Sequence, residues 1–449
     1  MVLDSSKIMN IHQIAIFAEM DKFEDFILAN EKSDTSRLLL SVKSWPAPEF
    51  PLPGNLTPRD LAVCTIDSRK KLARKVPQWH AITSLAYVNT ISAEQCSSTQ
   101  TATYKASLAR KILNEHPDCA PTLTVDLTGG MGVDSWAFSK VSSKVIYNEM
   151  NPDLAAAAGH NFPILGMDNV TISCAEVKPG NVDSIIGDPE PGLIFLDPAR
   201  RASDGKKVFL LEDCQPDVLK LVPELFSRCR HILLKLSPMA DISMVRERLE
   251  DAAGKRCVRE IHIVAFGGEC KELLIWMDRE HNGEASTICC EDGNVISFDD
   301  VRKEDEAPQM DSTWMEILFE PGKSLTKAGV FSAVARKFHL AKLARFTHLY
   351  AVPRPLGEDE SKALAEQLVR FGKVFTVSEV LPLNKAAMKE VGKRFPKCEV
   401  SARNIPLSSD ELRSRLKVGS GDDAHIFGAR IELPYDAGNH ILVCQPFKG

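Results

Sequence analysis

Residues 124–134 (TVDLTGGMGVD) join three features that together could hold a ligand. A β-type run ends at the carboxylate of Asp126, a turn follows with Gly129, Gly130 and Gly132, and a helix is expected from Asp134. Glycines let the main chain pass close to a bound nucleoside, and the first turn of a helix supplies free N–H groups. A dinucleotide fingerprint reads GxGxxG with an acid about 20 residues later. The GGxG spacing after Asp126 fits that fingerprint poorly, so we expect a nucleoside site without a pyrophosphate.

Polar side chains also stand at four later strand ends. Glu149 follows Asp126 by 23 residues, and at a strand end it could accept hydrogen bonds from both ribose hydroxyls of an adenosine. Glu176, Asp197 and Lys235 stand at or near the ends of the next three apolar runs. Because open α/β sheets bind ligands at the carboxyl edge of their parallel strands, we expect these side chains to converge there.

Less specific interpretations of these residues stay open. The glycine turn could be a tight strand-to-helix connection without a ligand, and Glu176 could be a surface acid. Arg200 and Arg201 could contact substrate phosphates or form surface ion pairs with nearby aspartates. For Lys235 we slightly favour a strand end whose ammonium reaches back to water over a role in substrate binding.

The elements that must position these residues alternate between strand and helix from residue 121 onward. This pattern is typical of a doubly wound parallel α/β sheet. Strands are expected at 123–127, 144–147, 170–173, 193–196 and 231–236, helices at 134–140, 152–160 and 216–229, and an antiparallel pair at 258–264 and 273–277. The preceding residues, 1–118, are predicted to be helical, with helices starting after Thr57 and at residues 97–99.

The remainder of the chain is predicted to fold separately. Residues 280–311 are polar and acidic, which indicates a linker or a small module. Later helices are expected at 327–343, 358–371, 384–394 and 409–416, and strands at 347–352, 373–380, 398–402, 424–431 and 440–444. The expected domains are therefore 1–118 (helical), 119–279 (parallel sheet), 280–322 (acidic linker or small module) and 323–449 (α+β).

Composition excludes several classes of protein. With 449 residues, 44% hydrophobic and 26% charged, the chain is expected to form about three globular domains. No apolar run approaches the ~18 residues of a membrane span, and no secretory signal is recognisable, so we expect a cytoplasmic protein with no membrane partner. The twelve cysteines include no CxxC pair, so we expect reduced thiols and no metal.

Charge is distributed unevenly along the chain. The net charge is -6, but residues 321–449 carry 21 Lys and Arg against 13 Asp and Glu, a net of +8. Residues 336–346 (RKFHLAKLARF) interleave cations, starting with Arg336 and Lys337, with aromatic side chains. Such a stretch could neutralise RNA phosphates and stack on unpaired bases. It could equally be an amphipathic helix that buries Phe338, Leu340, Leu343 and Phe346.

The ordered strand-end residues over about 95–278 resemble the class I S-adenosyl-L-methionine-dependent methyltransferases, which have a Rossmann-like sheet. The resemblance implies that Asp126, Thr128 and the three glycines hold the methionine end of the cofactor, that Glu149 holds its ribose and that Glu176 flanks its adenine. It also implies that residues 94–98, which include Gln95, cap the cofactor from the N-terminal side.

The segment Asp197-Pro198-Ala199-Arg200 is similar to the catalytic-loop motif of that family. The common form is Asp/Asn-Pro-Pro followed by an aromatic residue or Arg; this sequence departs from it at Ala199 and Arg200, and is nearer to the Asp-Pro-Pro-Arg form of RNA uridine and related RNA methyltransferases. We therefore expect Asp197 to orient the methyl acceptor or take its proton, with Pro198 and Ala199 shaping the pocket wall. This element contains no Pro-Cys motif, so the sequence gives no support for a covalent cysteine mechanism.

The whole chain resembles a narrower group, bacterial methyltransferases with a THUMP-like C-terminal α+β domain. The resemblance rests on residues 94–98, 126–132, 197–201, 347–350 and 380–385. THUMP domains bind RNA, so it implies a methyltransferase acting on tRNA or rRNA, with Arg200, Arg201, Lys235, Arg336 and Lys337 as candidate catalytic or substrate-binding residues. Two alternatives stay open: a non-catalytic RNA-binding protein with a vestigial methyltransferase fold, and a small-molecule or protein methyltransferase.

Overall fold

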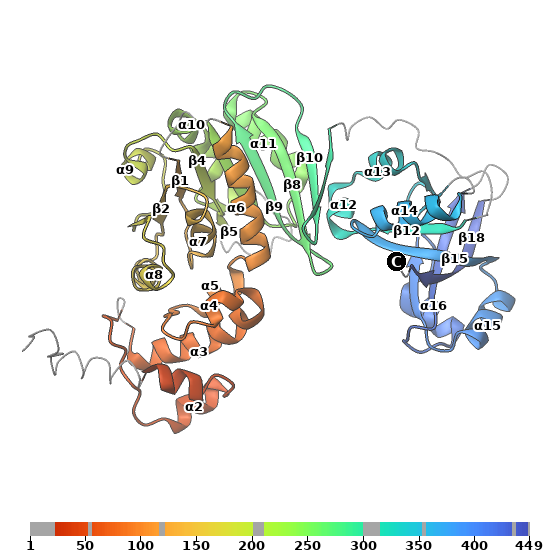
Figure 1. The fold of residues 1–449 in the computed structure, drawn as a ribbon, viewed down its shortest axis with the longest axis horizontal. Helices are drawn as coiled ribbons and strands as arrows, with labels where there is room; N and C mark the ends of the chain where they lie inside the picture. The colour runs from red at the N-terminus through yellow and green to blue at the C-terminus, as the bar shows by residue number, and fades with distance from the viewer. Residues whose placement is uncertain are drawn as a thin grey trace, which may run out of the picture. The chain divides into compact units, whose positions relative to one another are not determined.

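The computed structural model describes residues 23–52, 56–115, 122–200, 211–299, 315–352, 356–432 and 437–447, without the side chain of Arg200 (Figure 1). By their internal contacts the described residues form two compact units. The first comprises residues up to Val258 together with Ile275–Gly283, and the second comprises Arg259–Leu274 and residues from Glu284 onward. The two units are described separately below. In the part of the chain described, no helix is both long and apolar enough to cross a membrane.

The first unit begins with helices, as expected. They are a helix over residues 23–29, α2 (Thr35–Ser41), α3 (Pro58–Lys75), α4 (Pro77–His80), α5 (Thr90–Gln95) and α6 (Thr99–Asn114). Thr57 forms a capping box with Asp60 at the start of α3, and Ser98 forms one with Thr101 at the start of α6. These caps satisfy N–H groups that a helix start otherwise leaves unpaired, which explains why both helices begin where the sequence predicts.

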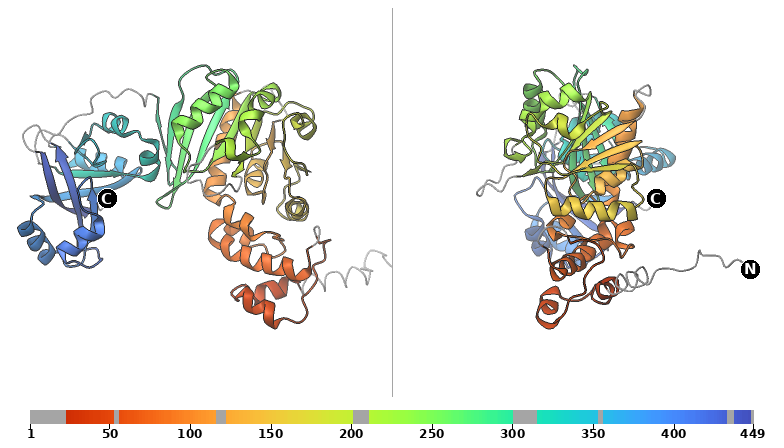
Figure 2. Two further views of the ribbon diagram at one scale, coloured as in Figure 1. Left: turned by 180° about the vertical axis from the view of Figure 1, so that it is seen from behind. Right: turned by 90° about the vertical axis from the view of Figure 1, so that its left-hand side faces the viewer.

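A parallel sheet follows, and it confirms the predicted α/β class. Its strands are β1 (Leu123–Asp126), β2 (Lys144–Asn148), β3 (Val170–Ser173), β4 (Leu193–Leu196) and β7 (His231–Leu236). The helices between them are α7 (Val133–Ser139), α8 (Pro152–Ile164), α9 (Val182–Ile186), α10 (Val218–Arg228) and α11 (Ile242–Ala253). The helices α6, α7 and α8 share one face of the sheet, and α9, α10 and α11 share the other (Figure 2).

Further strands extend the sheet. With β8 (Val258–Phe266), β9 (Glu269–Asp278), β10 (Ser286–Glu291) and β11 (Asn294–Phe298), the strand order is β11-β10-β8-β9-β7-β4-β1-β2-β3. A separate two-stranded ribbon pairs β5 (Ala199–Arg200) with β6 (Cys214–Gln215), which the 3-10 helix η2 (Leu211–Asp213) precedes.

Part of the predicted acidic linker is therefore sheet, because β10 and β11 form an antiparallel hairpin within residues 280–322. Their turn contains Asp292 at φ 47° and Gly293 at φ 89°, conformations that a two-residue hairpin turn requires. The run from Thr287 to Glu291 is buried, so a short apolar strand lies within acidic surroundings. Residues 300–314 of the same stretch lie outside the described residues.

The second unit contains a seven-stranded mixed sheet in the order β13-β14-β12-β15-β18-β17-β16. Its strands are β12 (Ile317–Pro321), β13 (Ala341–Lys342), β14 (Tyr350–Ala351), β15 (Gly372–Pro382), β16 (Glu399–Arg403), β17 (His425–Glu432) and β18 (Ala437–Pro446). Its helices are α12 (Lys323–Ala328), α13 (Phe331–Phe338), α14 (Glu358–Leu368), α15 (Lys385–Arg394) and α16 (Ser409–Leu416). Side chains of β17 alternate between two buried clusters, so both faces of this sheet are covered.

The helix predicted over 327–343 is wrong in extent. Gly329 at φ 68° ends α12, and His339 at φ 52° ends α13, after which the chain turns into β13. Phe338, Leu340 and Leu343 are buried, as the amphipathic interpretation requires. Phe346, which that interpretation also buries, is 64% exposed because it follows the end of the helix in a loop.

Candidate functional site

The carboxyl ends of five adjacent parallel strands carry the predicted residues in spatial order. Because the strands run β7-β4-β1-β2-β3, their ends present Lys235, Asp197, Asp126, Glu149 and the segment before Glu176 side by side. The sequence predicts this convergence without knowing the strand order. The strand order adds which residues are neighbours, and hence which can bond to one another.

Asp126 is fully buried beneath the glycine turn. Its Oδ1 accepts a hydrogen bond from the Thr128 N–H at 3.1 Å, and its Oδ2 accepts one from Ser135 Oγ at 2.6 Å. Burial raises the pKa of Asp126 to about 7, although the Ser135 and Thr128 hydrogen bonds lower it. Both carboxylate oxygens are bonded within the chain, so Asp126 positions the turn and the start of α7.

Glycine occupies the three positions of the turn for different physical reasons. A Cβ on Gly129 would lie 2.1 Å from Cε2 of Tyr147, and a Cβ on Gly132 (φ 89°) would lie 2.6 Å from Cε1 of Phe162. Gly130 has φ 54°, and a Cβ there would meet no atom within 4 Å. Packing therefore requires Gly129 and Gly132, whereas Gly130 leaves room for a ligand to approach the main chain.

Glu149 fastens the glycine turn to the end of β2. Its Oε2 accepts a hydrogen bond from the Gly130 N–H at 2.8 Å, and its Oε1 accepts one from the Asn151 N–H at 2.8 Å. The residue is 9% exposed. Each carboxylate oxygen keeps a second lone pair, so Glu149 can still accept hydrogen bonds from a ligand.

Asn148, beside Glu149, is a buried polar residue that the sequence analysis missed. Its Nδ2 donates to the carbonyls of Leu127 at 3.1 Å and Ala175 at 3.0 Å, which joins the ends of β1, β2 and β3. Its Oδ1 is buried with no hydrogen-bond partner among the described residues. A buried acceptor without a donor is unfavourable, so this atom is a candidate to meet a ligand N–H or O–H. The available signal was a second polar residue at the same strand end.

Asp197 is held at two places. Its N–H donates to Thr128 Oγ1 at 2.6 Å, which joins the ends of β4 and β1, and its Oδ2 forms an ion pair with the Lys235 ammonium. The Lys235 side chain is 14% exposed and that of Asp197 35%. The ammonium of Lys235 thus contacts the neighbouring strand end, so the interpretation that it merely reaches back to water is wrong.

The rest of the catalytic-loop motif is described only in part. Pro198 is buried beside Asp197, and Ala199 and Arg200 enter the β5 strand. The side chain of Arg200 and all of Arg201 lie outside the described residues. Their roles stay predictions.

The segment before α6 is fastened to the first turn of α7. Ser97 Oγ donates to Asp134 Oδ2 at 2.8 Å. The fully buried Lys105 donates to Ser97 Oγ at 2.9 Å and pairs with Asp134 Oδ1 at 3.2 Å. Gln95, at the end of α5, is exposed two residues before this network. The structure therefore brings residues 95–98 beside the helix that follows Gly132.

Cys96 lies among the same charges. Burial raises the pKa of its thiol to about 11, and the charges of Lys75, Asp134 and Lys235 also act on it. Its Sγ donates to the Ala93 carbonyl at 3.3 Å. A thiol with so high a pKa is a poor nucleophile at neutral pH.

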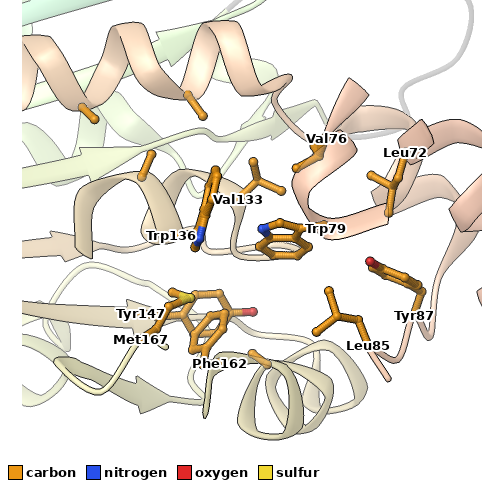
Figure 3. Close-up of a cluster of buried hydrophobic side chains, with 14 residues drawn as sticks. Leu72, Val76, Trp79, Leu85, Tyr87, Val133, Trp136, Tyr147, Phe162 and Met167 are labelled. Carbon is orange, nitrogen blue, oxygen red and sulfur yellow. The ribbon is translucent and has the colours of Figure 1, made fainter. Parts of the chain in front are cut away.

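A buried apolar cluster supports the glycine turn from the N-terminal helices (Figure 3). Trp79 of α4 packs edge-to-face on Trp136 of α7, with ring centroids 6.2 Å apart. Tyr147 packs edge-to-face on Phe162, and these two rings fill the space beside Gly129 and Gly132. Tyr147 also donates its hydroxyl to the Gly130 carbonyl at 2.5 Å. The helical region thus forms one core with the candidate site.

Glu176 lies at the edge of the site and is only partly buried. Its carboxylate pairs with Lys178 at 2.6 Å and accepts a hydrogen bond from Gln215 Nε2 at 3.4 Å.

The predicted RNA-binding residues Arg336 and Lys337 belong to the second unit and not to the strand-end site. Lys337 donates to the Ser297 carbonyl at 3.2 Å, so its ammonium is engaged within that unit. The described residues include no cluster of three or more metal-ligating side chains.

Comparison with known proteins confirms the predicted resemblance. A family model described as "THUMP domain-like" matches residues 372–446, and a "ferredoxin-like domain" model matches residues 318–356. A crystal structure described as "putative methyltransferase from Porphyromonas gingivalis W83" is similar over 100% of both chains, with 28% identity and a TM-score of 0.75. No curated protein matches the chain.

Two other solved structures align with about two fifths of the chain. An rRNA methylase from Streptococcus thermophilus is 14% identical over 38% of this chain and 94% of its own, with a TM-score of 0.28. A SAM-dependent methyltransferase from Agrobacterium tumefaciens is 13% identical over 39% of this chain and 61% of its own, with a TM-score of 0.29. These two alignments cover only part of the chain, whereas the match to the Porphyromonas gingivalis structure covers all of it.

Proposed function

We propose that the protein is an S-adenosylmethionine-dependent methyltransferase that modifies RNA, either tRNA or rRNA. The observation that carries this proposal is the pair formed by Gly130 and Glu149. Gly130 leaves open space at a main chain with positive φ, and its N–H is bonded to a carboxylate that keeps free lone pairs. This is an arrangement in which a nucleoside can lie against the backbone while its ribose hydroxyls donate to an acid.

The residues present fit that cofactor. Glu149 would hold the ribose, and the unpartnered Oδ1 of Asn148 would accept one further hydrogen bond from the ligand. Gly130 would let the methionine end approach, with Asp126 and Thr128 fixing the turn from behind. Glu176 would flank the adenine, and Gln95 stands on the capping segment that Ser97 ties to α7.

Asp197 is proposed to orient the methyl acceptor. The cofactor, when bound, supplies an activated methyl group, so the chain needs mainly to position the acceptor and exclude water. The Lys235 ammonium forms an ion pair with the Asp197 carboxylate and orients it, and the Thr128 hydrogen bond fixes the Asp197 main chain. An ionised carboxylate can accept a hydrogen bond from an acceptor N–H or O–H and take its proton. Pro198 would form the pocket wall, and Arg200 and Arg201 would contact RNA phosphates.

RNA as the substrate is supported by the THUMP-like match at 372–446 and by the net charge of +8 over residues 321–449. Lys337 already donates to a carbonyl of β11, so we assign Lys337 a lesser share of RNA binding than its sequence suggests, and Arg336 stays a candidate RNA-binding residue. A cytoplasmic location stays a prediction.

The test incubates the full chain with S-adenosylmethionine labelled on its methyl group, once with total RNA and once with an RNA-free extract. We expect label in RNA that ribonuclease releases, and little label in the RNA-free extract. Label confined to protein or small molecules would contradict RNA as the substrate. Binding of the cofactor without any transfer would indicate a vestigial enzyme.

A further inference from the structure

The loop between β13 and β14 presents an unusual side chain. Among the described Phe, Tyr and Trp residues, Phe346 is the only one that is exposed, at 64% of its surface. Apolar side chains on either side of it, Leu343 and Leu349, are fully buried, and Thr347 is 1% exposed. A large ring that points to water from a loop with buried neighbours is a candidate binding residue.

Hydrogen bonds hold this loop firmly to the end of β17. The Glu432 N–H donates to the Leu343 carbonyl at 2.7 Å, and Thr347 Oγ1 donates to the Arg430 carbonyl at 2.7 Å. The Leu343 N–H donates to the Leu349 carbonyl at 3.0 Å, which closes the loop on itself. The backbone that carries Phe346 is therefore fixed, and ordering it on binding would cost little conformational entropy.

One cation lies beside the ring, and two more belong to its loop and to the strand that anchors the loop. The guanidinium carbon of Arg345 lies 5.3 Å from the ring centroid of Phe346. Lys342 donates to the Arg345 carbonyl at 3.1 Å, and Arg430 pairs with Glu432 at 3.0 Å. This loop and its anchor on β17 thus carry three cations and one acid, Glu432, a balance that favours an anionic partner.

We propose that Phe346 and Arg345 form a stacking platform for an unpaired base of the RNA, with Lys342 and Arg430 beside its phosphates. This rests on the proposed RNA substrate and names the form in which that RNA is recognised. Aromatic faces and guanidinium planes stack on unpaired bases, whereas the bases of a duplex are already stacked on one another. A docking protein would fit less well, because the ring stands among charges instead of within a wider apolar surface.

The loop also lies where the two matched segments meet. Phe346 belongs to the ferredoxin-like match at 318–356, and Arg430, whose carbonyl anchors Thr347, belongs to the THUMP-like match at 372–446. The platform therefore depends on both segments, and neither family match alone contains all of its residues.

The experiment measures fluorescence anisotropy of the full chain with a fluorescein-labelled 12-nucleotide single-stranded RNA, and with a hairpin duplex of the same composition. Phe346→Ala is expected to weaken single-strand binding about ten-fold, since stacking on one base is worth roughly that much. Phe346→Trp should bind at least as well as the native chain, and its fluorescence should be quenched by the stacked base. Val369→Ala, another exposed apolar side chain of the same unit, is the matched control and should change nothing.

Unchanged single-strand affinity in Phe346→Ala would overturn the proposal and would leave the exposed ring to a protein partner. Equal losses for single strand and duplex would overturn it as well. Thermal unfolding of each variant identifies misfolding, and Phe346→Trp gives a second readout if the alanine variant is unstable. Calorimetric binding of S-adenosylmethionine reports separately on the first unit. Absence of cofactor binding would therefore count against the proposed function and leave the result for Phe346 standing.

Discussion

The strand-end site of the first unit and the basic region of the second unit use charge in opposite ways. In the first, the acids Asp126 and Glu149 are buried, and both accept main-chain N–H groups of the loops that they hold. In the second, arginines lie near the surface and pair with local acids, as Arg394 does with Glu379. The net charge of a region therefore overstates the number of its cations that are available to RNA. The strand-end acids, by contrast, could be located from their positions at the ends of apolar runs.

The largest expected effect is on catalysis. Asp197→Ala should lower the rate of methyl transfer to RNA about 10²- to 10⁴-fold, the usual contribution of a group that moves a proton, and leave cofactor affinity unchanged. Lys235→Met should lower the rate by less than Asp197→Ala does, because it removes the ion pair that orients Asp197 but keeps the carboxylate. Initial rates with labelled cofactor measure both. Full turnover in Asp197→Ala would exclude its proposed role.

The second-largest effect distinguishes a glycine that packing requires from a glycine that lets a ligand approach the main chain. Gly129→Ala forces a Cβ against Tyr147 and should lower the free energy of unfolding by about 1–3 kcal/mol. Gly130→Ala meets no atom, so only its positive φ costs stability, about 1 kcal/mol, while cofactor affinity should fall further than in Gly129→Ala. Chemical denaturation and calorimetry of the two variants measure the two effects. Equal stability losses with equal affinities would contradict the assignment.

The pH dependence of stability sharpens the contrast between two buried carboxyls. Burial raises the pKa of Asp126 to about 7. At Asp278 burial has the same tendency, but hydrogen bonds from Arg230 and the Glu280 N–H outweigh it and lower the pKa to about 2. A carboxyl group whose pKa is raised in the folded state stabilises the folded protein at pH values below its unfolded-state pKa, which is near 4. This stabilisation is lost as the pH rises to 7.

Asp126 should therefore lower the free energy of unfolding by about 2–3 kcal/mol between pH 5 and pH 8. Asp126→Asn should remove that dependence. Asp278→Asn is the control, because Asp278 stays ionised over this range and loses its stabilisation only as pH falls from about 4 through 2. Urea denaturation at several pH values, followed by tryptophan fluorescence, measures the difference. Parallel pH curves for the native chain and Asp126→Asn would show that Asp126 does not bind a proton in this range.

The smallest effect concerns a paired cation. Arg394 donates to Glu379 at 2.9 Å at the surface of the second unit, and such pairs contribute at most about 1 kcal/mol. Arg394→Gln should therefore change RNA affinity less than two-fold, and less than Arg345→Gln does. Anisotropy titrations at one salt concentration compare the two. A larger loss in Arg394→Gln would show that pairing does not withhold this cation from RNA.

Position along the chain was the part of the site that could be predicted. Short apolar runs ending in Asp126, Glu149 and Asp197 identified the strand ends, because a strand leaves the core where its apolar run stops. The ion pair of Lys235 with Asp197 could not be predicted, because it depends on the order β7-β4-β1 across the sheet. For the same reason, the sequence could not show that both carboxylate oxygens of Asp126 accept hydrogen bonds within the chain.

Two elements were missed because their apolar signal is weak. The helix α11 buries only Val245 and Leu249 among its twelve residues, so its period was not recognised. The strand β10 is a short buried run within an acidic stretch, and the surrounding charge suggested a linker. In both cases packing against the sheet stabilises an element that its own composition does not favour.

Isothermal titration calorimetry of S-adenosylmethionine against the full chain and its Glu149→Gln variant is the most direct test of the proposed cofactor site. We expect one cofactor per chain, with affinity at least ten-fold weaker in Glu149→Gln. The variant replaces the carboxylate proposed to accept the ribose hydroxyls by a neutral amide whose nitrogen accepts no hydrogen bond, and hydrogen bonds to a charged group contribute about 1.5–3 kcal/mol. No binding by the native chain, or equal binding by both proteins, would contradict a cofactor site at Gly130 and Glu149.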